Sequence, residues 1–331
     1  MEADDGLWSD GVQRELERLE QACGPERLPP VLEVEAHQRA LARRAEAPLS
    51  SDAPDWSVGM HGGVPVLVPR SQLDDADAVA LSAQVSTVAD RNELAPLAEE
   101  LTRRSSDPIV RARAIFRWVA DAIAFDASAG ELPPQDPSSV LARRTAAGDG
   151  HAKLVEALGQ HANLRISCVY GHGRSRSWRF VALDEGHSGG APPVNHCWNA
   201  LYAGNSWHLL DAAWAAGSVT SDGQFHKAFD EAYWLPLPPR MAVTHRPVLP
   251  GWQLLAEPIT ERQYRQSVPR GAAFFRHGLQ MLSHPVDGTI RCGQRVDIIL
   301  GHAPHVPVHF ACVLVEECIG EEAVASDGWP H

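Results

Sequence analysis

The sequence predicts an α+β fold, because helical patterns come first along the chain and strand patterns follow. Apolar residues recur at helical spacing across much of residues 92–160. Between residues 165 and 212, short apolar runs bounded by turn residues indicate strands. Helices and strands that occupy separate stretches of a chain are typical of α+β domains, whereas alternation would indicate a parallel α/β sheet.

The best-defined helix is predicted over Ile109–Ala124. Asp107 supplies the capping side chain and Pro108 the first helical residue, where a missing N–H costs nothing. Further helices are predicted over residues 92–104 and 150–160, with a shorter helical turn at 136–141.

A hairpin is predicted from Gly204-Asn205, a dipeptide suited to a two-residue turn. The strands would be 196–203 and 206–212, after earlier strands at 165–170 and 180–183. Pairing Ala203 with Ser206 places His196 and Asp211 on one face as diagonal neighbours, about 7–8 Å apart at the backbone. Cys197 then points to the opposite face.

The chain divides into three predicted regions. Residues 1–85 are expected to be a partly disordered N-terminal region, residues 86–220 the core, and residues 221–331 a β-rich C-terminal extension. Within the flanks, helices are expected at 11–23 and 34–47, and strands at 64–69, 295–300 and 306–315. The chain ends soon after the last of these strands, as a fragment of a longer product would.

Composition narrows the function classes. The net charge of −13 argues against a nucleic-acid partner, because phosphate binding needs clustered Lys and Arg. No apolar run is long enough to span a membrane, and no signal-like stretch opens the chain. With six scattered cysteines, this predicts a cytoplasmic protein with reduced thiols. No cofactor is expected, and no Cys/His spacing matches a zinc finger or ribbon.

Two segments carry candidate chemistry, Asn195-His-Cys-Trp-Asn199 and Trp207-His-Leu-Leu-Asp-Ala-Ala-Trp214. His196 and Asp211 are typical of the base and its orienting carboxylate in a Cys-His-Asp hydrolase or acyltransferase. Two alternatives stay open. The pair could be packing residues of a purely structural protein, or His151, His196 and Asp211 could gather a metal ion.

Several segments resemble transglutaminase-like domains, most strongly those of the kyphoscoliosis peptidase family, which includes hillarin-type cytoskeletal proteins. They are the helix at 107–126, Val140–Arg144 with Gly150-His-Ala, and both strands of the hairpin. Residues 251–260 and 272–279 resemble that family's C-terminal extension, so the likeness covers about residues 90–315. It implies a papain-like α+β core, with a nucleophilic cysteine at the N-terminus of a buried helix.

The resemblance places that cysteine at Gly148, and His151 takes the position of an aromatic residue. His196 and Asp211 match the other two members of the triad. The implied function is a catalytically inactive transglutaminase-like protein, a cytoskeleton-associated scaffold or interaction module with protein partners.

The alternative is an active cysteine protease or transglutaminase whose nucleophile has moved to Cys168 or Cys197. The distance from the Gly148 Cα to the His196 ring bears on this choice. A separation of about 6–8 Å would fit a site built for a cysteine side chain.

Overall fold

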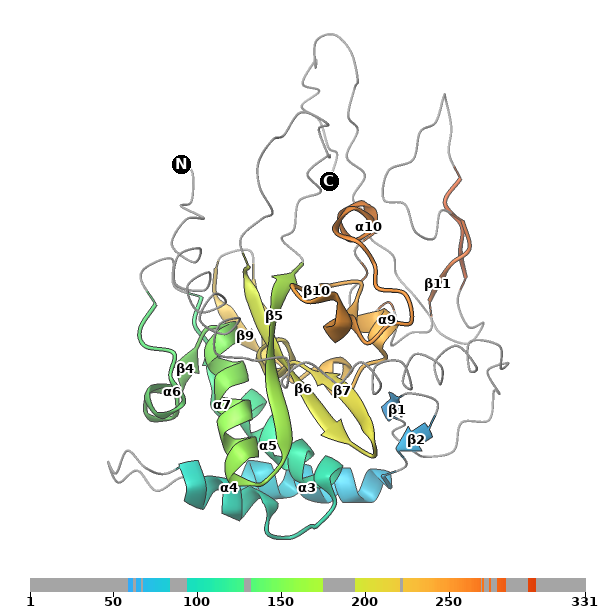
Figure 1. The fold of residues 1–331 in the computed structure, drawn as a ribbon. Coiled ribbons are helices and arrows are strands. Elements are labelled where there is room, and N and C mark those ends of the chain that lie inside the picture. Colours follow the sequence, from blue (N-terminus) through green and yellow to red (C-terminus); the bar gives the residue numbers. More distant parts are fainter. Residues whose placement is uncertain are drawn as a thin grey trace.

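The computed structural model confirms the α+β class, with helices packed against a four-stranded antiparallel sheet (Figure 1). The strand order is β10-β5-β6-β7. These strands span His245–Pro247, Arg165–Gly173, His196–Ala203 and Ser206–Leu210 respectively. The structure describes residues 59–61, 64–66, 68–83, 94–127, 132–174, 194–220, 223–268, 270, 274, 279–283 and 297–301.

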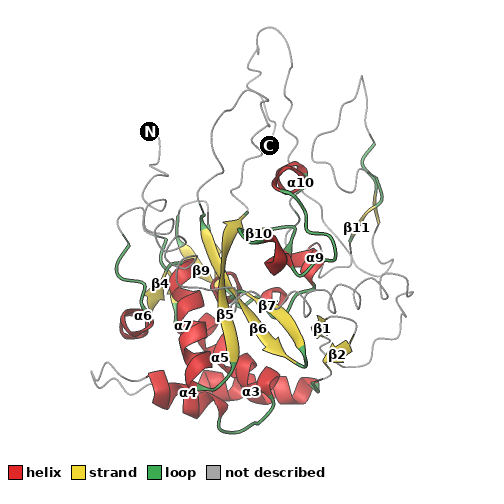
Figure 2. Ribbon diagram, viewed as in Figure 1, coloured by secondary structure: helices red, strands yellow, loops and turns green. Residues whose placement is uncertain are grey.

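Among the described residues, five helices precede the strands of the sheet in sequence, and Figure 2 shows them gathered on one side of it. Two begin as predicted at an aspartate followed by proline: the side chains of Asp107 and Asp136 accept backbone N–H bonds at the starts of α5 and α6. Helix α7 packs against β5 and β6. The helices are α3 (Arg70–Ser82), α4 (Leu94–Thr102), α5 (Pro108–Ala122), α6 (Pro137–Arg143) and α7 (Gly148–His161).

The hairpin has the predicted register, with Ala203 opposite Ser206 and Asn199 opposite Leu210. The predicted second strand is two residues too long, because pairing stops at Leu210 and α8 (Ala212–Ala216) follows. Asp211 causes this change: its side chain accepts a hydrogen bond from the Trp214 N–H and caps the new helix.

Two apolar clusters cover the two faces of the sheet. The larger lies between the helices and the sheet, and includes Phe116, Leu154, Ile166 and Leu201. The smaller covers the other face, where alternate residues of β6 and β7 meet the segment that follows. It consists of Val169, Trp198, Ala200, Trp207, Leu209, Met241, Trp252 and Leu254. Strand alternation therefore sorts the hairpin residues as predicted.

A buried arginine ties three segments together. The Arg113 side chain on α5 is 0% exposed and pairs with Asp77 of α3 at 2.6 Å. It also pairs with Glu231 at 2.6 Å, at the start of the short 3₁₀ helix η2 (Glu231–Tyr233). Helix α3 was not predicted from the sequence. Its buried residues Leu73, Ala76 and Ala80 join the larger core.

The remaining elements are short. They are β1 (Gly59–His61), β2 (Val64–Val66), β3 (Ala124–Phe125), β4 (Thr145–Ala146), β8 (Gly217–Val219), β9 (Phe225–Lys227), α9 (Pro238–Met241), η3 (Pro250–Gln253), α10 (Glu261–Gln266), β11 (Gln280–Met281) and β12 (Leu300–Gly301). None of the described helices has the length and apolar character needed to cross a membrane.

Several predictions in the flanks have partial outcomes. The strand predicted at 64–69 is present at 64–66, whereas residues 68 and 69 lead into α3. Of the strand predicted at 295–300, residues 297–299 are not in a strand and residue 300 is. The elements predicted at 11–23, 34–47, 180–183 and 306–315 lie outside the described residues.

Candidate functional site

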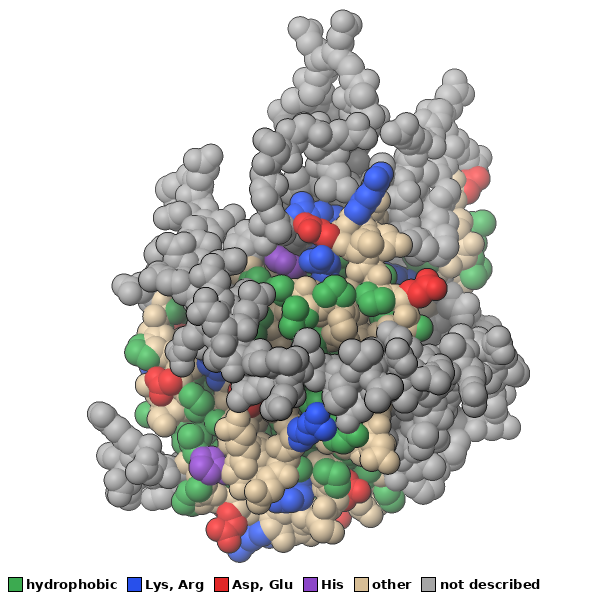
Figure 3. All heavy atoms as spheres, viewed as in Figure 1, with side chains coloured by type: hydrophobic (Ala, Val, Ile, Leu, Met, Phe, Trp, Pro, Cys, Tyr) green, Lys and Arg blue, Asp and Glu red, His purple; other side chains and the backbone are tan. Residues whose placement is uncertain are grey.

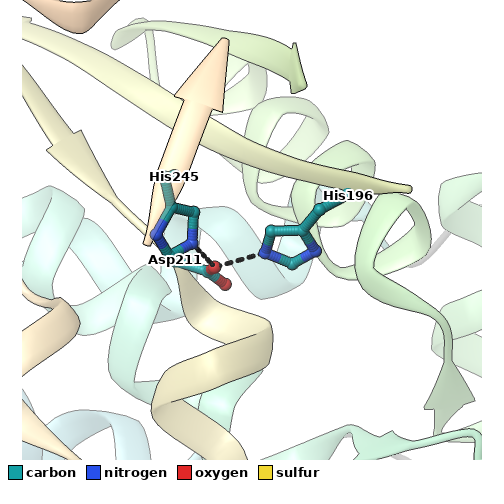
Figure 4. A group of neighbouring side chains, drawn as sticks. All are labelled: His196, Asp211 and His245. Carbon is teal, nitrogen blue, oxygen red and sulfur yellow. Dashed lines mark hydrogen bonds and ion pairs between the residues drawn. The ribbon is translucent and has the colours of Figure 1, made fainter. Parts of the chain in front are cut away.

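His196 and Asp211 lie in direct contact beside the N-terminus of α7. Nε2 of His196 is 2.6 Å from Oδ2 of Asp211, and both side chains are buried (Figure 4). His196 opens β6, and Asp211 lies between β7 and α8. The carboxylate is held from its other oxygen, because Oδ1 accepts the Trp214 N–H at 2.9 Å. Asp211 therefore orients the imidazole from a helix cap and not from a strand.

A second imidazole, His245, joins the same carboxylate. Its Nε2 lies 2.9 Å from Asp211 Oδ2, so both rings point at one oxygen (Figure 4). Its Nδ1 lies 2.8 Å from the Thr244 hydroxyl. His245 was not predicted from the sequence, because it lies on a three-residue strand among turns. Pairing of β10 with the edge of β5, which sets His245 opposite Gly173, brings it to the site.

Burial and hydrogen bonding fix the charges of this group. Burial alone would raise the pKa of Asp211. The interactions of the carboxylate with His196 and His245 outweigh burial and hold the pKa of Asp211 well below its usual range. The hydrogen bond to Asp211 favours the charged form of His245. Burial has the larger, opposite effect and lowers the pKa of His245 to about 4. At neutral pH the site thus contains a carboxylate and a neutral His245.

Aromatic rings enclose the three polar side chains. The ring of Trp214 lies 5.2 Å from that of His196 and 4.4 Å from that of His245. The Trp198 ring lies 5.9 Å from that of His196, and the Tyr233 ring lies 6.2 Å from that of His245. These apolar surroundings keep the local dielectric constant low and strengthen the hydrogen bonds inside.

The His196 ring fills the space between two glycines. A Cβ atom at Gly148, the first residue of α7, would lie 2.7 Å from Nδ1 of His196. A Cβ atom at Gly173 would lie 3.1 Å from the same side chain. Because a Cα–Cβ bond is about 1.5 Å long, the Gly148 Cα is within about 4.2 Å of Nδ1. The separation of about 6–8 Å that would fit a cysteine site is therefore not present.

His151 is not part of the group, although the metal alternative included it. Its Nδ1 lies 2.8 Å from the Ala147 carbonyl and its Nε2 lies 3.3 Å from the Ile123 carbonyl. The ring stacks on Phe125 within the interior. Burial lowers the pKa of His151. The set of potential metal ligands is instead His196, Asp211 and His245, whose donor atoms lie within 4.8 Å of one another.

The two described cysteines lie on the other face of the sheet. Asn199, on the same face as Cys197, donates from its amide to the Ala152 carbonyl of α7. The hydrogen bond with Cys197 and burial raise the pKa of the Cys168 thiol, and burial raises the pKa of Cys197. Both side chains are therefore protonated and directed away from His196.

Comparisons with known proteins identify similar sequences. The sequence model of the transglutaminase-like superfamily matches residues 95–212, from α4 to the cap of α8. Kyphoscoliosis peptidase of Mus musculus is 29% identical over 215 residues, which are 64% of this chain and 32% of that protein. Hillarin of Drosophila melanogaster is 24% identical over 224 residues, 63% of this chain and 26% of that protein.

A solved structure described as a TGase is 16% identical, with a TM-score of 0.27, over 50% of this chain and 37% of that one. The chain spans about a third or less of the length of the curated relatives it matches. The matched segment contains α7, His196 and Asp211, the elements that build the site. Residues 95–212 thus carry a transglutaminase-like domain, and the chain is similar in sequence to kyphoscoliosis peptidase and hillarin.

Proposed function

We propose that this protein is a catalytically inactive member of its superfamily that acts as a cytoskeleton-associated scaffold or interaction module. The observation that carries the proposal is the contact between Gly148 and His196. Gly148 opens α7 and faces Nδ1 of His196, as a nucleophile facing its base would. Glycine has no side chain to attack an acyl carbon, so the covalent route is lost.

The location favours a thiolate if a cysteine were there. The backbone N–H groups at the start of a helix and its dipole lower the pKa of a thiol. His196, fixed by Asp211 at 2.6 Å, would supply the base. The contact of His196 with Asp211 supports the assignment of the pair as two members of a triad, although the ring lies closer to Gly148 than a cysteine there would allow.

The alternative, an active enzyme with a relocated nucleophile, has less support. Cys197 is next to His196 in sequence, but neighbouring residues of a strand point to opposite faces. Its thiol and that of Cys168 have raised pKa values, which disfavours the reactive thiolate.

An activity measurement tests the absence of catalysis. The purified chain is assayed for amine incorporation into a protein substrate and for proteolysis, beside the His196→Ala variant. We expect equal background rates in both proteins. Thiol-dependent turnover that disappears in His196→Ala would overturn the proposal.

Labelling of Gly148→Cys tests whether this position is that of the nucleophile. We expect an alkylating probe to react faster with Gly148→Cys than with Gly148→Cys/His196→Ala, because only the first has a base beside the thiol. The imidazole must shift to admit the new Cβ, which would lie 2.7 Å from Nδ1. Equal rates in the two variants would contradict the assignment.

The scaffold role rests on the resemblance to hillarin-type proteins and on the character of the surface. On the face shown in Figure 3, basic, acidic and apolar side chains of the described residues are interspersed. Such a mixture supports a protein partner more than a polyanion. Co-sedimentation of the full chain with actin filaments, and separately with microtubules, tests the cytoskeletal role. Absence from both pellets would contradict it.

A further inference from the structure

We propose that His196, Asp211 and His245 together bind one divalent transition-metal ion of the zinc type. Two imidazoles and a carboxylate are ligands that Zn²⁺ prefers among nitrogen and oxygen donors. The three come from separate segments, the start of β6, the cap of α8 and the start of β10 (Figure 4). The proposal concerns binding alone and does not depend on whether the chain is catalytic.

The spacing of the donor atoms suits a single ion. The three atoms lie within 4.8 Å of one another, and each imidazole nitrogen is 2.6 or 2.9 Å from Oδ2. Zinc bonds to nitrogen and oxygen are about 2.0–2.2 Å long, which puts tetrahedral ligands about 3.4 Å apart. No pair of donors therefore has to move by more than about 1.4 Å relative to each other.

Neighbouring hydrogen bonds already orient two of the ligands. The Trp214 N–H occupies Oδ1 of Asp211, which leaves Oδ2 as the ligand oxygen. The Thr244 hydroxyl lies 2.8 Å from Nδ1 of His245, so this nitrogen can donate its proton there while Nε2 binds the ion. Histidine ligands of metal ions are commonly held in this way through their second nitrogen.

Charge and access are compatible with an ion. A divalent ion would take the place of the protons between each Nε2 and Oδ2, each ligand ring would then carry its one proton on Nδ1, and the carboxylate would offset part of the charge of the ion. The side chains of Asp211 and His245 are 1% and 0% exposed, whereas His196 keeps 6%. An ion would therefore enter on the side of His196. No thiolate competes at residue 148, which is glycine, and the described cysteines face away.

Equilibrium dialysis of the full, untagged chain against Zn²⁺, followed by metal analysis, tests the proposal. The test variant is His245→Gln, and the matched control is His226→Gln, an exposed histidine of β9. We expect about one ion per chain for the wild type and the control, and at least tenfold weaker binding for His245→Gln. Binding that is absent from the wild type, or unchanged in His245→Gln, would overturn the proposal.

A measurement on the unaltered protein covers the case in which His245→Gln does not fold. X-ray absorption of the zinc-loaded wild type reports the neighbours of the ion directly. We expect a nitrogen and oxygen shell at about 2.0–2.1 Å with the scattering pattern of two imidazoles. A sulfur shell at about 2.3 Å would place the ion on cysteine and overturn the assignment.

Discussion

The imidazole of His196 occupies the place where a side chain at Gly148 would begin. A Cβ atom at Gly148 would lie 2.7 Å from Nδ1, closer than nonbonded atoms tolerate. Asp211 holds Nε2 at 2.6 Å and Gly173 also lies against the ring, so the ring can withdraw from residue 148 only by disturbing these contacts. The glycine at residue 148 and the position of this ring therefore depend on each other.

Gly148→Ala is expected to lower the free energy of unfolding by about 1–3 kcal/mol, the usual cost of overpacking an interior. Alanine is favoured over glycine in a helix by about 1 kcal/mol, so the expected sign is opposite to that of helix propensity alone. Urea unfolding of the two proteins measures the difference.

The same substitution in a His196→Ala background serves as the control. With the ring removed, Gly148→Ala should become neutral or stabilising, and the double-mutant cycle should show a coupling of about 1 kcal/mol or more. Equal costs in both backgrounds would show that the ring is not the cause.

His245 should make the protein less stable as the pH falls from about 6.5 to 4. Its pKa is about 4 in the folded state and 6.5 in the reference state, so the unfolded chain binds the proton first. Folding stability is complete above about pH 6.5 and should decline by about 3 kcal/mol by pH 4.

The variant His245→Gln should show a flatter profile across this range. Urea unfolding at pH 7, 6, 5 and 4 provides the comparison. Asp211 does not affect this comparison, because its carboxyl has a lowered pKa and changes the stability only near and below pH 4. Parallel profiles for the two proteins would contradict the prediction.

Arg113→Met should destabilise the fold by about 2–4 kcal/mol. The substitution leaves Asp77 without its main partner, although the 41% exposure of the Glu231 side chain reduces the effect below that of a fully buried pair. Arg265→Met is the matched control, since the half-buried pair of Arg265 with Glu261 within α10 should contribute less than about 1 kcal/mol. Chemical denaturation measures both variants. Similar small decreases in the free energy of unfolding for both variants would show that the ion pairs of Arg113 do not stabilise the packing of these segments.

Cys168 and Cys197 should resist alkylation in the folded protein. Both thiols have raised pKa values, and Cys197 is 1% exposed. Mass spectrometry after brief treatment with iodoacetamide at pH 8 should find them unmodified in buffer and modified in urea. Rapid labelling of Cys197 in buffer would revive it as a candidate nucleophile.

Local signals were sufficient to predict the middle of the domain. Helix α5 follows from the Asp107-Pro108 start and a long apolar face, and the hairpin register follows from the turn at Gly204-Asn205. That register sufficed to bring His196 and Asp211 together. The boundary at Leu210 was not predicted, because an aspartate that ends a strand and one that caps a helix look alike in sequence.

Long-range contacts explain what the sequence did not reveal. Helix α3 has a weak apolar face, and its place in the core depends partly on Arg113, which is 36 residues away from its partner Asp77. His245 reaches the site through pairing of β10 with β5, between residues more than 70 positions apart. The sequence pattern of α3 or β10 alone does not indicate these distant partners.

Asp211 performs two tasks with its two oxygens. One oxygen starts α8, and the other receives both imidazoles. Selection for a stable fold would therefore retain this carboxylate even in a protein without catalytic activity. It would also retain the two histidines that stabilise the buried charge of Asp211. Residue 148 forms no such hydrogen bonds, and its constraint is steric, because the ring of His196 leaves no space for a larger side chain. The presence of such a His-Asp pair in a protein is therefore explained by the stability of the fold and is not by itself evidence of catalytic activity.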